Sequence, residues 1–410
     1  MTSVTRRRSI VRCPAGYAAL LAAGFAVCAP TRADIITTWA DTTTAIATDG
    51  PNTVHTMALA QQAVYEAVNG ITRRYPRDLI DLGTSEGASI ESAVAAASRT
   101  VLLHEAPTLR SDIEAAYQQA IAAISDGDAR TRGIHVGELA AADVLTKHEH
   151  DIGTLEPYRP LTSPGVFVPT TLPLGVSIAQ QRPWVMKSQN QFRPAPPPSL
   201  KSKEWAQDYN ETRQLGALQS QARTPAQQEI ALFWATALPD IHIGVVRSYA
   251  ATGSRDITRN ARLYAAIMAA VNDAEIAVFE AKYHYQLWRP ITAIRNGDRD
   301  DNPATERDAN WSPLITTPLQ PEYPCGHCII ASTIATVLIL DAGDQAMPVL
   351  STTSNTRQGV TRYWAKPQDL VDEVINARIY SGVHFRSAGN AGARMGEQIG
   401  RLVATAYGLL

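Results

Sequence analysis

Apolar residues recur at helical spacing through the first third of the chain. In the segment 54–68 they lie three or four residues apart, at Met57, Ala60, Val64, Ala67 and Val68. This spacing places them on one face of an α-helix. The same pattern returns over residues 91–103, 109–124 and 131–147. We therefore predict four helices that together form an N-terminal helical layer.

Helical periodicity stops between residues 151 and 202. Prolines cluster there, ending in the run from Pro194 to Pro198. Because proline lacks a backbone N–H and fixes φ, such a segment does not continue a helix. A connection of this length without regular structure is uncommon in a compact domain and is usually functional. We predict a long irregular excursion that either wraps the surface or caps a site.

The second half of the chain is helical again, most strongly over residues 257–287, where Leu263, Val271 and Phe279 belong to one broad apolar face. A polar loop is expected over 298–318. The other helical segments are 205–218, 224–238, 242–252, 328–340, 367–380 and 388–407. No segment alternates convincingly between apolar and polar residues, and no repeat of fixed period is present. The predicted fold class is all-α, with a helix bundle at its core.

The N-terminus has the pattern of an export signal. Arg6, Arg7 and Arg8 precede an apolar run over residues 15–29, and small residues follow it. This order is typical of a cleaved secretory signal, and the paired arginines also match a twin-arginine signal. Either route predicts an exported protein, periplasmic or secreted. The predicted divisions are 1–33 for the signal, 34–202 for the N-terminal layer with the excursion, and 203–410 for a second helical domain.

Composition narrows the classes of function. The 410 residues carry a formal net charge of −2, so no basic excess suggests nucleic acid as a partner. After the N-terminal run, no apolar segment is long enough for a comfortable membrane span. Removal of the signal leaves only Cys325 and Cys328. A chain of this size with one possible disulfide does not depend on disulfides for its core. The oligomeric state is not predicted.

Cations and a histidine are concentrated in the C-terminal third. Lys282 and Arg289 stand near the end of the long predicted helix. Arg378 precedes His384 by six residues, and Gly382 marks where we expect the helix to break and turn His384 inward. Lysine and arginine side chains bind the oxygens of a highly charged tetrahedral anion, such as phosphate or vanadate. This set therefore indicates an oxyanion site.

The loop before the apolar helix over 328–340 adds a second kind of anion ligand. It reads Pro324-Cys325-Gly326-His327. Glycine lets the backbone approach a ligand closely, and the first N–H groups of a helix have no partner within that helix. With His384, the loop gives the site two histidines. One can then bond the central atom of the anion while the other transfers protons.

These three segments, in this order and spacing, resemble the signatures of vanadium-dependent haloperoxidases and type 2 phosphatidic acid phosphatases. The flanking residues 302–305, 311–314 and 321–324 look like those of bacterial haloperoxidase-like proteins, which are soluble and often exported. The resemblance is strong over roughly 257–400. It implies the helix-bundle fold of that superfamily and a vanadate cofactor.

The resemblance also implies a role for each residue. Three cations would bind the equatorial oxygens of vanadate: Lys282, Arg289 and Arg378. The loop would add the Gly326 N–H, with Cys325 standing where the family has serine. His384 would be the residue bonded to vanadium, and His327 the acid–base group. The substrates would be hydrogen peroxide and a halide.

Three positions depart from the family pattern. Ala388 stands where an acid usually follows the histidine ligand by four residues, and Cys325 replaces serine. Gln320 occupies the halide-side position, so no halide is predicted. We favour a vanadate-dependent peroxidase. Two alternatives remain: a soluble phosphomonoesterase in which His384 attacks a phosphate ester, and a catalytically weakened oxyanion-binding homologue.

The sequence from Cys325 to Cys328, Cys-Gly-His-Cys, is also that of the dithiol centre of a protein disulfide isomerase. Such a centre follows a strand within a βαβ pattern. Residues 318–324 are instead proline-rich, and no strand is predicted before Cys325. We therefore favour the oxyanion interpretation. Whether the two cysteines join in an oxidising exterior stays open.

The remaining polar residues of note have simpler interpretations. His148 and His150 lack a third metal ligand nearby, so we interpret them as an exposed polar turn. His242 is interpreted as structural. Glu280 and Glu322 either partner the cations or face water.

Overall fold

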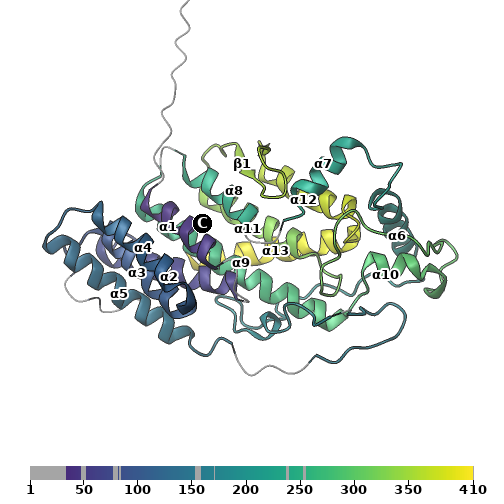
Figure 1. Cartoon of the computed structure of the whole chain (residues 1–410), viewed down its shortest axis with the longest axis horizontal. Helices are drawn as coiled ribbons and strands as arrows, with labels where there is room; N and C mark the ends of the chain where they lie inside the picture. Colours follow the sequence, from purple (N-terminus) through teal and green to yellow (C-terminus); the bar gives the residue numbers. More distant parts are fainter. Residues whose placement is uncertain are drawn as a thin grey trace, which may run out of the picture. The chain divides into compact units, whose positions relative to one another are not determined.

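Helices make up most of the described chain in this computed structural model (Figure 1). The structure describes residues 34–47, 52–76, 82, 85–152, 158–169, 171–236, 240–252 and 255–409. Together with one very short sheet, these helices confirm the all-α prediction. The predicted export signal at 1–33 lies outside the described residues.

The helices have the following bounds in chain order: α1 Ile35–Ala47, α2 Thr53–Thr72, α3 Ile90–Glu105, α4 Arg110–Ala122, α5 Asp128–His148, α6 Lys203–Leu215, α7 Pro225–Phe233, α8 Asp240–Ala250, α9 Ile257–Tyr285, α10 Pro290–Arg295, α11 Gly326–Ala342, α12 Pro367–Tyr380 and α13 Arg386–Ala406. Every helix predicted from periodicity is present, although α7 ends at Phe233 and residues 237–238 of the predicted segment 224–238 lie outside the described residues. Helix α1 was not predicted, because its run of Thr42, Thr43 and Thr44 has low intrinsic helix propensity. Burial of its apolar residues compensates for this.

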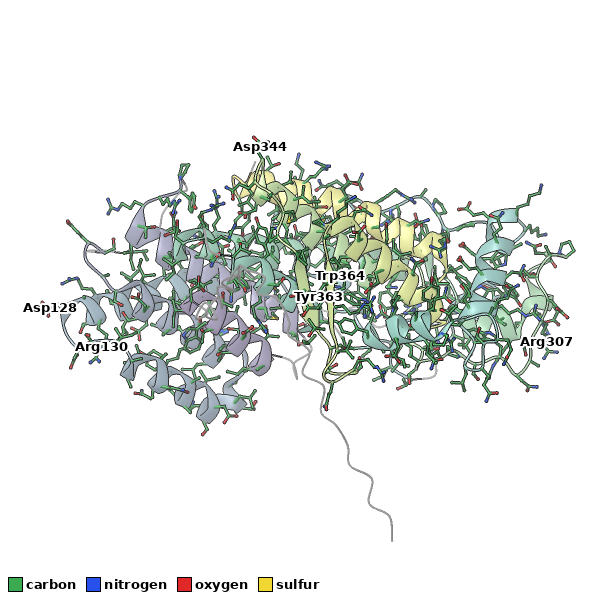
Figure 2. All side chains as sticks on the ribbon, turned by 90° about the horizontal axis from the view of Figure 1, so that it is seen from above. Asp128, Arg130, Arg307, Asp344, Tyr363 and Trp364 are labelled. Atoms are coloured by element: carbon green, nitrogen blue, oxygen red, sulfur yellow. A yellow bond between two sulfur atoms is a disulfide. The ribbon has the colours of Figure 1, made fainter. Side chains whose placement is uncertain are left out.

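A short antiparallel hairpin is the main departure from the predicted elements. Strand β1 (Leu350–Thr353) pairs with β2 (Thr361–Trp364), with Leu350 opposite Trp364. Tyr363 and Trp364, labelled in Figure 2, show the alternation expected of a strand, since Tyr363 is 68% exposed and Trp364 is buried. Four residues per strand are too few for this alternation to stand out in the sequence.

Helix α9 is the central element of the described fold. The Asp256 side chain accepts a hydrogen bond from the Arg259 N–H at 2.9 Å, which caps the first turn. The helix ends where Gln286 takes a left-handed conformation, with φ 49°. Helices α2, α11 and α13 pack against it. The last turn of α9 therefore carries Lys282 into the interior.

Helix α13 packs directly on the backbone of α11. A Cβ added at Gly392 would lie 2.6 Å from the Cys325 carbonyl oxygen, and one added at Gly396 would lie 2.3 Å from the Ile329 carbonyl oxygen. Only glycine permits such an approach. The Cys325 N–H also donates to the Ala388 carbonyl at 3.0 Å. These contacts hold the first turn of α11 in place.

The irregular excursion is tied to α9 by a buried carboxylate. Asp273 accepts hydrogen bonds from the backbone N–H groups of Trp184, Val185 and Met186, at 2.7, 3.0 and 2.9 Å. Burial raises the pKa of Asp273 to about 6, and the three N–H groups oppose this shift. One side chain thus satisfies the backbone of a segment that lacks regular structure.

The same excursion reaches the site described below. The Phe167 N–H donates to the Gln286 carbonyl at 2.7 Å, and the Leu174 N–H donates to the Leu319 carbonyl at 2.8 Å. Residues 173–178 line the principal cavity. Of the two alternatives predicted for this segment, the structure therefore supports a cap over a site.

No helix in the described ranges is long and apolar enough to cross a membrane. The predicted boundary between residues 202 and 203 stays a prediction, although α2 and α9, which lie on either side of it in the sequence, pack together.

We expect Asp273→Ala to lower the free energy of unfolding by about 3 kcal/mol, because three N–H groups lose a charged acceptor. Urea unfolding followed by circular dichroism measures this. Asp344→Asn, at an exposed position visible in Figure 2, is the control. Equal midpoints for wild type and Asp273→Ala would refute the anchoring role.

Candidate oxyanion site

Lys282 lies in the last turn of α9 and is 1% exposed. Its Nζ donates to the carbonyls of Pro321 and Glu322, at 2.8 and 3.0 Å. Burial lowers the pKa of Lys282 well below its usual value, and the nearby Arg289 lowers it further. The two carbonyls belong to the loop that precedes α11, so they bring this lysine next to the start of that helix.

Arg289 immediately precedes α10 and is equally buried. Its Nε donates to the Gln320 carbonyl at 2.7 Å, and its Nη1 donates to the Val383 carbonyl at 2.9 Å. Nη2 is buried and has no hydrogen-bond partner within the described structure. Burial lowers the pKa of Arg289 to about 10. The Nη2 of Arg289 is therefore left to donate a hydrogen bond to a ligand.

Arg378 lies in the last turn of α12 and is 2% exposed. Its Nη1 donates to the Trp234 carbonyl at 2.8 Å, whereas its Nε is buried without a partner among the described residues. Burial, and then the charge of Arg289, lower the pKa of Arg378 to about 9. The structure thus brings the three predicted cations to one pocket.

These cations suit a bound oxyanion. A buried, unpartnered N–H costs free energy, and buried like charges repel one another. Arg289 and Arg378 each keep one such donor. A tetrahedral anion between them would accept both hydrogen bonds and offset the repulsion. The residues present therefore suit vanadate or phosphate.

The N-terminus of α11 faces the same pocket. Gly326, its first residue, lines the cavity, and a Cβ added there would meet no other atom within 4 Å. The preceding Cys325 caps the helix, since its Sγ accepts the Cys328 N–H at 3.2 Å. Space therefore exists in front of Gly326 for a ligand that accepts a helix N–H.

Cys325 and Cys328 form a disulfide, and both are fully buried. A disulfide sulfur carries no hydrogen, so Cys325 cannot donate the bond that a serine would donate. The serine-like role expected of Cys325 is corrected accordingly: its sulfur caps α11. In the part of the chain that the structure describes, no strand comes before Cys325, and the buried sulfurs are closed to thiol exchange. Both facts count against the dithiol-enzyme interpretation.

His384 enters the site through the turn after α12. Gly382 has φ +76°, and its neighbourhood leaves no room for a Cβ. The His384 Nδ1 lies 2.9 Å from Glu322 Oε1, and its Nε2 lies 3.2 Å from Arg289 Nη1. Because arginine only donates, Nε2 is unprotonated, and Nδ1–H donates to Glu322. Burial, then Arg289 and Lys282, lower the pKa of His384 well below its usual value.

Glu322 is fully buried and holds His384 in that tautomer. The same Oε1 also accepts the Phe385 N–H at 2.9 Å. Burial raises the pKa of Glu322 to about 7, opposed by the Phe385 N–H and by Arg289 and Lys282. The sequence left the role of this residue open. The structure shows that Glu322 supplies, from another segment, a carboxylate for the histidine that Ala388 does not provide.

His327 is the second residue of α11 and lines the cavity. Its Nε2 lies 3.1 Å from the Thr236 carbonyl oxygen. Since a carbonyl only accepts, Nε2 carries the hydrogen and Nδ1 is unprotonated. Burial, then Arg378, lower the pKa of His327 well below its usual value. His242 packs near it, with ring centroids 6.2 Å apart, and does not line the cavity.

Comparison with known proteins gives this geometry a context. Residues 262–408 match the family described as the VCPO second helical-bundle domain, and this range contains every residue of the site. A vanadium chloroperoxidase from Curvularia inaequalis is 28% identical over 144 residues, which cover 29% of this chain and 23% of the relative. Over this range the chain is similar to proteins of the vanadium haloperoxidase family.

Solved structures extend the likeness to most of the chain. The first bacterial vanadium-dependent iodoperoxidase has a TM-score of 0.74 and 20% identity, covering 90% of this chain and 95% of that one. A holo-type bacterial vanadium-dependent chloroperoxidase has a TM-score of 0.69 and 15% identity, covering 88% and 92%. At these identities the comparison shows the fold, which confirms the predicted helix bundle.

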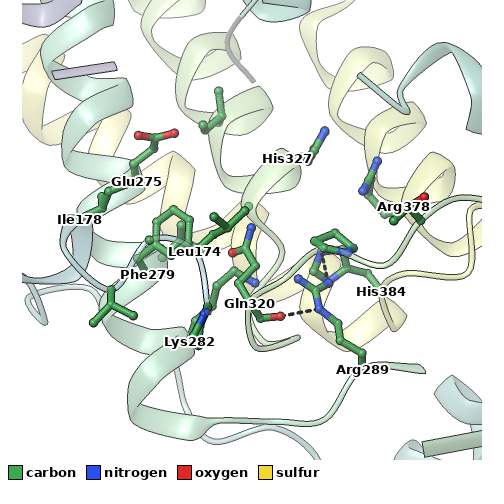
Figure 3. Close-up of a pocket in the computed structure, with 18 of the residues that line it drawn as sticks. Leu174, Ile178, Glu275, Phe279, Lys282, Arg289, Gln320, His327, Arg378 and His384 are labelled. Atoms are coloured by element: carbon green, nitrogen blue, oxygen red, sulfur yellow. Dashed lines mark hydrogen bonds between the residues drawn. The ribbon is translucent and has the colours of Figure 1, made fainter. Parts of the chain in front are cut away.

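The site forms one end of a cavity of about 740 Å³. Figure 3 shows Arg289, Arg378 and His384 at one side and Glu275 at the other. Much of the remaining wall is apolar: Pro173, Leu174, Val176, Ile178, Val278, Phe279, Ile315, Pro318 and Ile330. The anion site is therefore reached through a largely apolar space.

Residues interpreted as structural are found outside the cavity. His148 pairs with Asp151 and stacks on Trp184, with ring centroids 3.9 Å apart. The described residues contain no group of three or more His, Cys, Asp or Glu that would hold a metal ion. Glu280 pairs with Arg193. The contacts of His148 agree with its structural interpretation, although His148 is largely buried where an exposed turn was expected. For Glu280 the structure shows neither predicted alternative, since its partner Arg193 is not one of the three site cations.

We expect Glu322→Gln to weaken orthovanadate binding about 10- to 100-fold, because the histidine loses a charged acceptor that orients it. Vanadate-dependent shifts of the melting temperature, measured over a concentration series, give the affinity. Glu397→Gln, which alters an exposed pair with Arg401, is the matched control. Equal affinities in wild type and Glu322→Gln would refute the orienting role.

Proposed function

We propose that this chain is a vanadate-dependent peroxidase that oxidises halide with hydrogen peroxide. One observation carries the proposal. Buried, unpartnered guanidinium donors of Arg289 and Arg378 share a pocket with the unprotonated Nε2 of His384. This is what a tetrahedral oxyanion bonded to histidine requires. The similarity to proteins described as a vanadium chloroperoxidase and a vanadium-dependent iodoperoxidase supports it.

The chain offers a ligand for each part of vanadate. Its oxygens would be held by Lys282, Arg289, Arg378 and the Gly326 N–H, and His384 Nε2 would bond to the metal. When bound, vanadate supplies a Lewis acid that activates peroxide without a change in oxidation state. Glu322 keeps the Nδ1–H of His384 occupied, so Nε2 stays free of hydrogen.

His327 is the group suited to move a proton. Its Nε2–H is engaged with the Thr236 carbonyl, which leaves Nδ1 as the acceptor. Because burial and Arg378 lower the pKa of this imidazole, it is neutral at ordinary pH. We infer that Nδ1 takes the proton that hydrogen peroxide loses on binding and later returns it. The three cations attract both halide and peroxide anion to this end of the cavity.

A soluble phosphomonoesterase is the second candidate, and one observation favours it. The unprotonated Nε2 of His384, backed by Glu322 at Nδ1, has the arrangement of a histidine nucleophile for phosphorus. The same cations would bind the phosphate. The grounds for a catalytically weakened homologue are reduced, because Glu322 provides the carboxylate absent at Ala388.

One pair of assays separates these functions. We expect the mature protein with orthovanadate to oxidise at least one of iodide, bromide and chloride in the presence of peroxide. His384→Ala should reduce this rate to background, because the metal loses its bond to the protein. In parallel, hydrolysis of a phenyl phosphate ester is measured without vanadate. Hydrolysis that vanadate blocks, without halide oxidation, would replace the peroxidase proposal with the phosphatase.

We propose further that the protein is exported, as its N-terminal pattern indicates. The disulfide between Cys325 and Cys328 is consistent with an oxidising compartment. Fractionation of cells expressing the full chain, followed by N-terminal sequencing, should find a shortened protein outside the cytoplasm. Recovery of the full-length chain in the cytoplasm would count against export.

A further inference from the structure

Glu275 occupies an unusual position in the cavity. It lies on α9 two turns before Lys282, and it is the only carboxyl side chain among the described residues that line the cavity. Figure 3 shows it across the cavity from Arg378 and His384. Within the described structure, Glu275 forms no ion pair with Lys282, Arg289 or Arg378.

The carboxyl group of Glu275 has no hydrogen bond or ion pair within the described structure. The neighbouring carboxylates on α9 are satisfied: Asp273 accepts three N–H groups, and Glu280 pairs with Arg193. The accessible part of Glu275 faces the cavity, and burial of the rest raises its pKa to about 8. A carboxyl left unpaired in an apolar pocket costs free energy unless a ligand pairs with it.

An apolar stretch separates this carboxyl from the cations. Val278, Phe279 and Lys282 follow Glu275 by three, four and seven residues, which places all four on one face of α9. The two apolar side chains therefore lie between the two charged ones. The rise of an α-helix places the two charged positions about 10 Å apart along its axis. Ile178 from the excursion also lines this stretch.

Hydrogen peroxide and halide do not account for this space. A cavity of about 740 Å³ is far larger than either molecule and lies in the size range of sites for organic ligands. Neither molecule has an apolar body that would cover Val278 and Phe279. The far end of the cavity therefore needs another occupant.

We propose that the cavity directly binds an organic amine with an apolar, aromatic body, whose ammonium group pairs with Glu275 and whose other end reaches the oxyanion site. An ion pair with the ammonium group would favour the ionised form of Glu275. It would also give this carboxylate the hydrogen-bond partner that the protein does not provide. The body of the molecule would cover Val278 and Phe279 over about 10 Å, the span of two helical turns.

The further role of this amine, as the molecule that accepts the halogen, rests on the proposed peroxidase function. Peroxide and halide, with one proton, give hypohalous acid and water. The electron-rich aromatic carbon then takes the halogen and loses its proton, and the hydroxide of hypohalous acid leaves as water. No other oxidant is needed. Glu275 itself takes no part in the bond changes and acts only by positioning the amine.

The test compares three probes of equal length that differ at one end: 4-phenylbutylamine, 4-phenylbutan-1-ol and 4-phenylbutyrate. Their binding to the mature protein is measured by titration calorimetry in saturating inorganic phosphate, which occupies the cation site under either proposed function. We expect the amine to bind about tenfold more tightly than the alcohol, the value of one hydrogen bond to a charged group. The carboxylate should bind most weakly.

Two variants test whether the preference for the amine depends on Glu275. Glu275→Gln, which keeps the shape, should reduce the preference for amine over alcohol to less than about twofold. Glu280→Gln, on the same helix but paired with Arg193 outside the cavity, should retain it. The comparison within wild type needs no variant, so a folding defect in Glu275→Gln does not remove the test.

Halide oxidation by the same wild-type preparation is measured alongside. An amine preference that disappears in Glu275→Gln supports the inference, whether or not halide is oxidised. Halide oxidation without an amine preference overturns the inference and leaves the peroxidase proposal standing. A preference that persists in Glu275→Gln, or tighter binding of the carboxylate, also overturns it.

Discussion

The site is governed by the cost of burying three cations together. Lys282, Arg289 and Arg378 are almost inaccessible, and burial lowers the pKa of each. The charge of Arg289 lowers the pKa values of Lys282 and Arg378 further. Backbone carbonyls partly compensate, and they come from irregular segments rather than from helix interiors. This explains why the loops before α11 and after α12 take fixed paths: their carbonyls are hydrogen-bonded to the buried cations.

A buried charged side chain also holds a second irregular segment, the excursion, through hydrogen bonds to its backbone. The described residues of the excursion over 151–202 have almost no internal regular structure, yet Asp273 binds three of its consecutive N–H groups. Residues 173–178 of the excursion then form a wall of the cavity. The cavity combines the candidate anion site at one end with an unpaired carboxyl at the other.

Individual residues show where sequence reasoning succeeded and where it failed. The helical periodicity over 257–287 predicted α9, because a long buried helix has a strong signal of its own. Glu322 could not be assigned from its position, because its partner His384 lies 62 residues away in the chain. The role of Cys325 was misjudged for a related reason: only the fold shows that its sulfur is bonded to Cys328 and caps a helix.

The sequence by itself determined the helical class and the set of side chains suited to an oxyanion, because periodicity and residue chemistry are local properties. Tertiary structure alone decided which donors stay unpaired, which nitrogen of each histidine carries hydrogen, and which carboxylate supports His384. It also placed Glu275 across one cavity from Arg289, Arg378 and His384. These features depend on burial and on contacts between distant segments, so no short stretch of sequence encodes them.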